Sequence, residues 1–217
     1  MIVYGSSLSP FVRKVLAFGA EKGIELELKT VAPGSDDPDF LAASPFRKMP
    51  AFRDGDFAIS DSSAIIHYLE AKHPEPNLIP AAPETRARTI WYDEFGDTIL
   101  CGCGAKMFFN RIVAPMLGRE SDLVAADKAE REELPPILDY CERVLPESGW
   151  LVEDRLTLAD IAVATGFANL RHLGIRVDGG NHPKLAAYVE KMLARPSFAP
   201  WVERETQFLA RVSAAAA

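Results

Sequence analysis

The stretch Ser44-Pro45-Phe46-Arg47-Lys48-Met49-Pro50-Ala51-Phe52 is the segment from which the fold of this chain can be predicted. Pro50 cannot donate to a central ladder, so the Met49-Pro50 pair is expected at the start or edge of a strand. If that bond is cis, the backbone of Met49 turns outward with its N–H and C=O free, and such a pair can bind an extended peptide by strand addition. The alternative is an ordinary loop proline, because cis is a minority form, about 5–6% of X-Pro bonds in folded proteins.

The residues on either side of this stretch predict a small mixed α/β unit. Met1–Tyr4 is a short apolar run that fits a buried strand, and the turn after it leads to a helix whose N-cap is Ser9. Ile24–Val31 alternates apolar and polar residues, which is typical of a half-buried strand. The other elements expected here are a short helical turn at 39–43, a hairpin at 51–57 with Asp54-Gly55 at its tip, and a helix from Ser60 or Asp61 to Ala71.

A proline-rich connector follows, because residues 73–83 contain four prolines and should form a semi-rigid linker. The elements expected beyond it are helices at 84–112, at 121–145 with an interruption at Pro135-Pro136, from Thr157 with a Thr157–Asp160 capping box, from Pro183, and at 198–212, with fraying of the terminal alanines. The predicted organisation is an α/β domain at 1–79 and an all-helical domain at 84–217.

Composition and charge exclude several classes of function. A net charge of −7 disfavours a general nucleic-acid or anionic-membrane binder, and no apolar run approaches the roughly 20 residues that span a bilayer. The chain has an odd number of cysteines, and its first residues run directly into an expected strand, so we expect no signal peptide and a reducing cytoplasm. Cys101 and Cys103 lack a second ligand pair with zinc spacing, so no metal site is expected.

Four segments resemble the cytosolic glutathione transferase superfamily, in its serine-type classes. They are YGSSLSPFVRKV at 4–15, PFRKMPAF at 45–52, ISDSSAIIHYL at 59–69 and TLAD at 157–160. Their order and spacing extend the resemblance over nearly the whole chain. It implies a thioredoxin-like N-terminal domain, an all-helical C-terminal domain, a homodimer, and glutathione as co-substrate.

The reaction that the resemblance implies is attack by the glutathione thiolate on a small hydrophobic electrophile. A free thiol has a pKa near 8.5, and lowering it by about two units requires roughly 2.7 kcal/mol. A helix N-terminus supplies about 0.3–1 kcal/mol and a hydrogen bond to a charged group about 1.5–3 kcal/mol, so both are needed. Ser9 combines them and is the predicted catalytic residue, with Ser7 and Ser6 as rivals and Tyr4 as a weaker one.

Glutathione itself would be bound around two segments. Asp61 can pair with the γ-glutamyl ammonium, while Ser62 and the N–H groups of its helix can hold the α-carboxylate. The Met49-Pro50 segment would pair with the cysteinyl unit through the main chain. The cations expected near the glycyl carboxylate are Lys48, with Arg47 or Arg13 nearby.

The electrophile would lie between the first loop, the first long helix of the helical domain and the C-terminal helix. The candidate lining residues are Leu8, Phe11, Phe95, Thr98, Met107, Phe108 and Phe208. Two alternatives stay open at this point. The chain could be a non-catalytic ligand-binding or scaffold protein on the same fold, or the same thiolate could serve a glutathione-dependent peroxidase, isomerase or dehalogenase.

Overall fold

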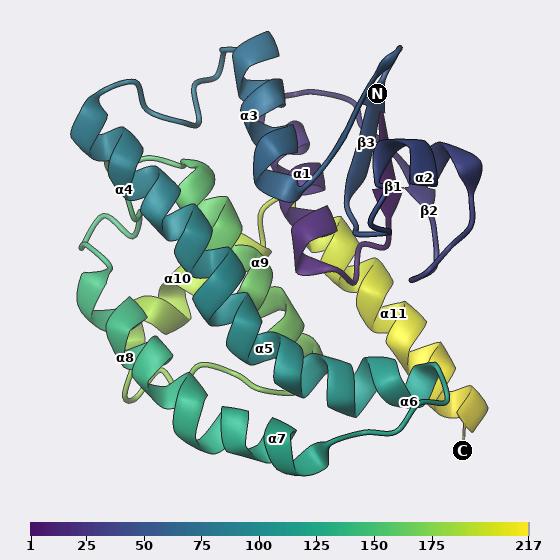
Figure 1. The fold of residues 1–217 in the computed structure, drawn as a ribbon. Coiled ribbons are helices and arrows are strands. Elements are labelled where there is room, and N and C mark those ends of the chain that lie inside the picture. Colours follow the sequence, from purple (N-terminus) through teal and green to yellow (C-terminus); the bar gives the residue numbers. More distant parts are fainter. Residues whose placement is uncertain (217) are drawn as a thin grey trace.

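A computed structural model describes residues 1–216, and its strands all lie in the first third of the chain (Figure 1). The elements of that first part are β1 (Ile2–Gly5), α1 (Pro10–Glu21), β2 (Glu27–Thr30), α2 (Pro38–Ala43), β3 (Ala51–Asp54), β4 (Phe57–Ser60) and α3 (Ser62–Lys72). The rest is helical: α4 (Pro83–Glu94), η1 (Phe95–Leu100), α5 (Cys101–Phe108), η2 (Phe109–Val113), α6 (Ala114–Met116), α7 (Leu123–Lys128), η3 (Ala129–Glu133), α8 (Leu134–Val144), α9 (Leu158–His172), α10 (Pro183–Leu193) and α11 (Ala199–Ala216). The predicted fold class is confirmed.

The sheet has the strand order β2-β1-β3-β4, in which β1 and β2 are parallel and the other neighbours are antiparallel. Successive side chains of a strand point to opposite faces. Val3 and Phe52 therefore join the large core shared with the helical part, while Tyr4 and Ala51 pack on α2 in a smaller cluster. Figure 1 shows α1 and α3 on the first face of the sheet and α2 on the other.

The helical part is built around α9, which is buried from Leu158 to Leu170. A long helical run from α4 to α6 crosses it, and Gly96 lies at the crossing, where an added Cβ would come within 2.9 Å of the Ala162 carbonyl oxygen. The Thr157–Asp160 capping box at the start of α9 is present as predicted. This close packing makes α9 a rigid wall behind the N-terminal part.

Three of the predicted elements differ from the observed ones. The strand expected at Ile24–Val31 is shortened to Glu27–Thr30, because Ile24 N–H bonds to Gly19 O at 2.8 Å and closes α1 instead. The hairpin turn falls at Gly55-Asp56, one residue later than expected, since Asp54 pairs with Phe57. The helical run at 121–145 is not broken at Pro135-Pro136. The prolines follow the π-helical η3 and occupy the first turn of α8, where a missing N–H costs little.

Several other expectations concern the ends and connections of the chain. The predicted fraying of the terminal alanines is wrong for residues 214–216, which continue α11, and Ala217 lies outside the described residues. The domain boundary at 73–83 stays a prediction. Within residues 1–216, no helix combines the length and the apolar character that crossing a membrane requires.

Candidate active site

The first loop, residues 5–9, places a free hydroxyl at the start of α1. Gly5 ends β1 at φ 152°, and a Cβ there would lie 2.6 Å from Val12 Cγ2, so this close approach requires glycine. Ser9 is the N-cap of α1, and its C=O accepts from Arg13 N–H at 3.0 Å. Its hydroxyl caps no backbone N–H. The hydroxyl is therefore available at the positive end of the helix dipole.

Side chains from α9 hold the backbone on both sides of Ser9. The Thr165 hydroxyl donates to Pro10 O at 2.7 Å, and Asn169 Nδ2 donates to Leu8 O at 3.2 Å. Both α9 residues are buried. The position of Ser9 is thus fixed by a helix more than 150 residues away in the sequence.

Arg13 ties the same helices together from the other side. Its fully buried guanidinium donates to Thr165 O at 3.1 Å and to Asn169 Oδ1 at 2.6 Å. It also pairs with Glu205 of α11 at 3.2 Å, and His172 Nε2 bonds to the same carboxylate at 2.8 Å. Arg13 is therefore a buried structural cation. The expectation that it lies near the glycyl carboxylate is wrong.

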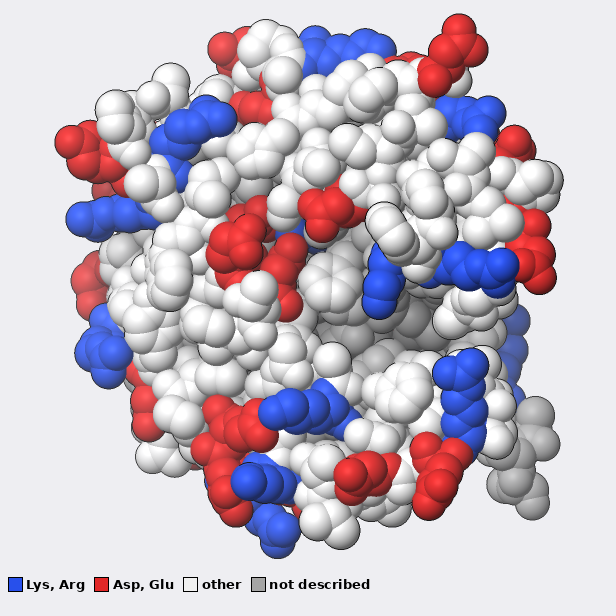
Figure 2. All heavy atoms as spheres, viewed as in Figure 1, with Lys and Arg blue, Asp and Glu red and all other residues white. Residues whose placement is uncertain are grey.

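A polar cavity of about 450 Å³ opens where β4, α3 and the α4–η1 junction meet. It is lined by Phe11, Lys48, Met49, Pro50, Ser60, Asp61, Ser62, Ser63, Glu94, Asp97 and Thr98. All five residues predicted to bind glutathione lie in this lining. Figure 2 shows a hollow on this side of the molecule, with acidic side chains along one edge and basic side chains along another.

Acidic and hydroxyl groups converge at the start of α3. Asp61 is its N-cap, with φ 84°, an uncommon value for a residue other than glycine, and accepts from Ala64 N–H at 3.0 Å. The Ser62 hydroxyl lies 3.4 Å from Asp97 Oδ2. Within residues 1–216, the buried Asp97 Oδ1 atom has no hydrogen-bond partner. Asp97 thus lines the cavity while one of its two carboxylate oxygens is buried without a partner.

A buried lysine fixes the acidic side of the cavity. Lys14 Nζ donates to Asp93 Oδ1 at 2.7 Å, Asp97 Oδ2 at 2.6 Å and Ser63 Oγ at 3.2 Å. Burial by itself would lower the pKa of Lys14, but the carboxylates of Asp93 and Asp97 outweigh it and raise that pKa. Lys14 is therefore an ammonium that anchors Asp97 toward the cavity.

The Met49-Pro50 bond is cis. Within residues 1–216, the main chain of Met49 makes no backbone hydrogen bond outside the sheet. The preceding residue is held firmly, because the Ser44 hydroxyl donates to Lys48 O at 2.7 Å and accepts from Lys48 N–H at 2.9 Å. Met49 lines the cavity, and its main-chain donor and acceptor are not used by the backbone hydrogen bonds of the described loops.

The two candidate cations beside Met49 have different surroundings. Arg47 pairs with Asp36 at 2.8 Å and donates to Gly34 O at 3.1 Å, and it does not line the cavity. Lys48 is exposed, lines the cavity, and its Nζ has no hydrogen-bond partner within residues 1–216. Lys48 is the cation that remains for an anionic ligand group.

A cleft with two chambers lies on the other side of Met49 and Phe11. The apolar chamber, of about 280 Å³, is lined by Ser6, Leu8, Ser9, Pro10, Phe11, Pro33, Met49, Cys101, Gly104, Ala105, Phe108, Phe109, Val113, Met116, Leu117, Gly166 and Asn169. The mixed chamber, of about 380 Å³, is lined by Ser6, Ser7, Leu8, Leu28, Thr30, Val31, Ala32, Pro33, Met116, Leu117, Arg204, Glu205 and Phe208. Phe11 and Met49 line both the polar cavity and the apolar chamber, so the two spaces meet beside them.

The residues predicted for the electrophile pocket divide into three groups. Leu8, Phe11 and Phe108 line the apolar chamber, and Phe208 lines the mixed one. Thr98 lies in the polar cavity instead. Phe95 and Met107 line none of the three, because both are buried in the core, at 3% and 0% exposure.

The rivals of Ser9 differ from it in position. Ser6 also lines the apolar chamber, whereas Ser7 is buried and lines only the mixed one. Tyr4 is buried in the small cluster beneath α2. The only thiol in the apolar chamber is Cys101, whose pKa burial raises to about 12, so it stays neutral.

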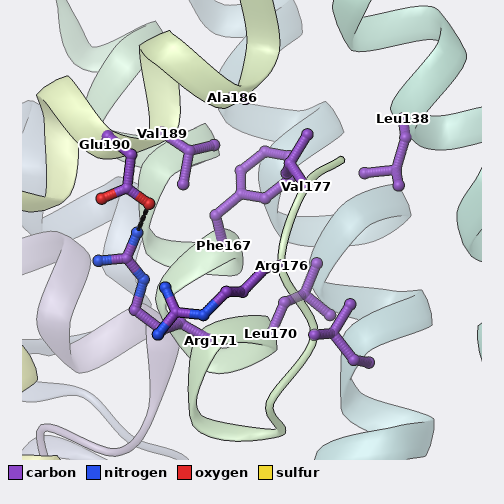
Figure 3. A pocket seen from close by; sticks show the side chains of 10 residues that line it. Leu138, Phe167, Leu170, Arg171, Arg176, Val177, Ala186, Val189 and Glu190 are labelled. Atoms are coloured by element: carbon purple, nitrogen blue, oxygen red, sulfur yellow. Dashed lines mark hydrogen bonds and ion pairs between the residues drawn. The ribbon is translucent and has the colours of Figure 1, made fainter. Parts of the chain in front are cut away.

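A separate crevice of about 140 Å³ lies between α8, α9 and α10 (Figure 3). Phe167 and Val189 form its apolar wall, and Arg171 pairs with Glu190 beside it. It shares no lining residue with the polar cavity or the cleft. Across residues 1–216, no group of three or more His, Cys, Asp or Glu side chains is arranged to hold a metal ion.

Comparisons with known proteins identify the family. Residues 3–77 match the model of the glutathione S-transferase N-terminal domain, and residues 109–205 match that of the C-terminal domain. Glutathione S-transferase 3 of Zea mays is 30% identical, with 90% of each chain covered.

The chain belongs to the glutathione transferase superfamily.

Other relatives support the same assignment to the family. A glutathione S-transferase of Hyoscyamus muticus is 29% identical over 94% of this chain and 98% of its own. Among solved structures, a glutathione S-transferase from Rhodospirillum rubrum F11 is 27% identical with a TM-score of 0.83, covering 92% and 90% of the two chains. One from Methylobacterium radiotolerans, in complex with glutathione sulfonate, is 31% identical with a TM-score of 0.75, covering 93% of each. The protein is thus a glutathione transferase by family, and the predicted recognition is confirmed.

Sequence reasoning missed several residues of this transferase's cleft. Glu94 and Asp97 line the polar cavity, and Phe109, Val113 and Asn169 line the apolar chamber. The only local signal was the i, i+3 and i, i+4 spacing of Asp93, Glu94 and Asp97 on one helix. The sequence around these residues could not show that Asp93 and Asp97 would pair with Lys14, which places their helix beside the cavity.

Replacing Glu205 by Gln tests the buried network in this transferase. We expect the free energy of unfolding to fall by about 3–5 kcal/mol, because Arg13 would remain buried without its anion. Urea denaturation measures the change. Glu203→Gln is the matched control, since Glu203 is an exposed residue of the same helix. Equal stability of the two variants would show that Arg13 does not depend on Glu205.

Proposed function

We propose that this enzyme activates the thiolate of glutathione with the Ser9 hydroxyl and conjugates it to a small hydrophobic electrophile. The observation that carries the proposal is the place of Ser9. Its hydroxyl makes no capping hydrogen bond and lies at the N-terminus of α1, where Ser9 lines the apolar chamber. Phe11 and Met49, which line both spaces, separate this chamber from the polar cavity. A polar ligand and an apolar one can meet there.

The energetics support Ser9 over its neighbours. The thiolate needs about 2.7 kcal/mol of preferential stabilisation to lower its pKa by about two units. A hydroxyl donor contributes about 1.5–3 kcal/mol and the α1 N-terminus about 0.3–1 kcal/mol. Among the three serines of the first loop, Ser9 is the one at the N-cap of α1. It therefore combines the hydroxyl donor with the helix N-terminus.

The polar cavity supports a definite orientation of glutathione. The γ-glutamyl ammonium would pair with Asp61 and with the carboxylate of Asp97, and its α-carboxylate with the Ser62 hydroxyl and the first-turn N–H groups. The cysteinyl unit would pair with the free main chain of Met49 beside Pro50. The glycyl carboxylate would then lie near Lys48.

The reaction that fits the cleft is nucleophilic addition or substitution by the thiolate. A carbon–sulfur bond forms, and the electron pair displaced from the electrophilic carbon passes to a leaving group or to an adjacent carbon that takes a proton from water. Peroxide reduction, isomerisation and dehalogenation can use the same thiolate. Conjugation is favoured here because the chamber beside Ser9 is almost entirely apolar and can desolvate a hydrophobic electrophile.

Packing against α9 supports the catalytic role of the first loop. Thr165 and Asn169 hold the carbonyls of Pro10 and Leu8, and Arg13 holds those two side chains in turn. A hydroxyl that must stabilise developing charge works best when its position is fixed in advance. Thr165 and Asn169 are therefore positioning residues in this proposal.

The proposal includes a homodimer, a cytoplasmic location and a division into domains at 73–83. Phe46 is 85% exposed and Trp91 49% exposed, so large apolar side chains are available for a partner subunit. The three cysteines are free thiols, which fits a reducing compartment.

Calorimetric titration with glutathione tests the binding site. The double variant Asp61→Ala/Ser62→Ala should weaken binding by about tenfold or more, because it removes charge-assisted hydrogen bonds to the γ-glutamyl group. Asp56→Ala, in the exposed hairpin turn, is the control and should bind as the parent does. Undiminished affinity in the double variant, with the fold checked by thermal melting, would place glutathione elsewhere.

Single serine variants test the catalytic assignment. Ser9→Ala should raise the pKa of the bound glutathione thiol by about one to two units and lower turnover near neutral pH accordingly. Ser6→Ala and Ser7→Ala should change neither by more than a small factor. Thiolate absorbance and the pH profile of kcat/KM measure the effect. Unchanged turnover in all three variants would exclude a serine of this loop.

Sedimentation equilibrium tests the dimer. We expect a mass of twice the 23.8 kDa chain, and a shift toward the single mass in Phe46→Ser because that change removes an exposed apolar contact. Phe57→Ser, at a less exposed aromatic residue that stacks on Tyr68, is the comparison. A parent protein that sediments at the single mass would contradict the homodimer.

A further inference from the structure

The apolar and mixed chambers form one elongated cleft. Their linings share Ser6, Leu8, Pro33, Met116 and Leu117. An occupant of the apolar chamber that is longer than this space can therefore extend past the shared wall into the mixed chamber. Ser9 lies in the apolar chamber only, so the reacting end of such a molecule would be at that side.

The charges along this cleft are confined to its far end. No Lys, Arg, Asp or Glu lines the apolar chamber, whereas Arg204 and Glu205 line the mixed one. Glu205 is 1% exposed and already pairs with Arg13 and His172. Its negative charge is compensated, so the free charge of the cleft is positive.

Arg204 carries that free charge. Its side chain is exposed and makes no hydrogen bond or ion pair within residues 1–216, and its guanidinium carbon lies over the Trp201 ring, 5.8 Å from the ring centroid. Phe208 lies one helical turn further along α11 and lines the same chamber. The end of the cleft thus offers a guanidinium beside an apolar surface.

We propose that the electrophile of this enzyme is an elongated amphipath with a terminal carboxylate, which Arg204 binds while the electrophilic carbon lies beside Ser9. A guanidinium forms two parallel hydrogen bonds to a carboxylate, and this geometry selects a planar anion at a fixed distance from the reacting carbon. The proposal rests on the conjugation proposed above and specifies the class of electrophile. Arg204 is a specificity residue in it and takes no part in the activation of the thiol.

The step can be written for an α,β-unsaturated ketone whose chain ends in a carboxylate. The glutathione sulfur forms a bond to the β-carbon as the carbon–carbon π bond breaks, and that electron pair passes through the α-carbon onto the ketone oxygen as an enolate. The ketone re-forms when the α-carbon takes a proton from water. No oxidant, reductant or further reactant is needed. The carboxylate is unchanged and serves only to hold the chain along the cleft.

The test compares two electrophiles of nearly the same shape, one with a terminal charge and one without. One is a medium-chain α,β-unsaturated ketone with an ω-carboxylate, and the other is its ω-carboxamide, which has nearly the same shape and no charge. We expect kcat/KM to favour the carboxylate by about tenfold in the parent enzyme, the ratio that one hydrogen-bonded charge pair supplies. Arg204→Gln should remove the preference by lowering kcat/KM for the carboxylate, and Arg204→Lys should keep part of it.

Arg211→Gln is the matched control, because it removes the same charge from the same helix two turns beyond Arg204, at a residue that lines neither chamber. It should keep the preference. Equal kcat/KM for the two electrophiles, a preference that survives Arg204→Gln, or binding of glutathione without turnover of either ketone would overturn the inference. Failure to bind glutathione at all would instead overturn the proposed function on which it rests.

Discussion

The buried guanidinium of Arg13 is the constraint on which the rest of the structure depends. A charge removed from water is stable only when it is paired and hydrogen-bonded, and an unpaired one costs several kcal/mol. The partners of Arg13 lie 152 to 192 residues further along the chain, in α9 and α11. The α1 helix therefore reaches its final environment only when the helical part has packed against it.

The next residue along the same helix strengthens this connection. Successive residues of an α-helix point about 100° apart, since a turn contains 3.6 residues. Arg13 accordingly contacts α9 and α11, while Lys14 contacts Asp93 of α4 and Asp97 of η1. Two adjacent cations thus hold α1 against the helical part from two directions, and the polar cavity and the apolar chamber meet at Phe11 in the first turn of that helix.

This arrangement explains why the cleft has its particular chemistry. Lys14 draws Asp97 to the cavity wall beside Ser62, which makes one side of the cavity acidic. Arg13 takes up the charge of Glu205, so the cleft near α11 keeps only a positive group. The buried ion pairs that join the two parts of the molecule therefore also decide which charges remain for ligands.

The sequence by itself determined what depends on near neighbours: the start of α1 at Ser9-Pro10, the capping box at Thr157–Asp160, the 48–50 and 61–62 segments of the polar cavity, and the order of sheet and helices. Only the tertiary structure decided which side chains of the helical run from α4 to α6 line the cleft. Its π-helical stretches η1 and η2 lengthen the turn from 3.6 residues and so rotate everything after them. Met107, which follows η1, consequently lies in the core, while Phe109 and Val113 line the apolar chamber. Phe95, the first residue of η1, lies in the core because α4 and η1 pack there against α9. The partners of Arg13 and Lys14 were likewise beyond prediction, because a buried charge is satisfied by residues that only the packing of distant helices brings within reach.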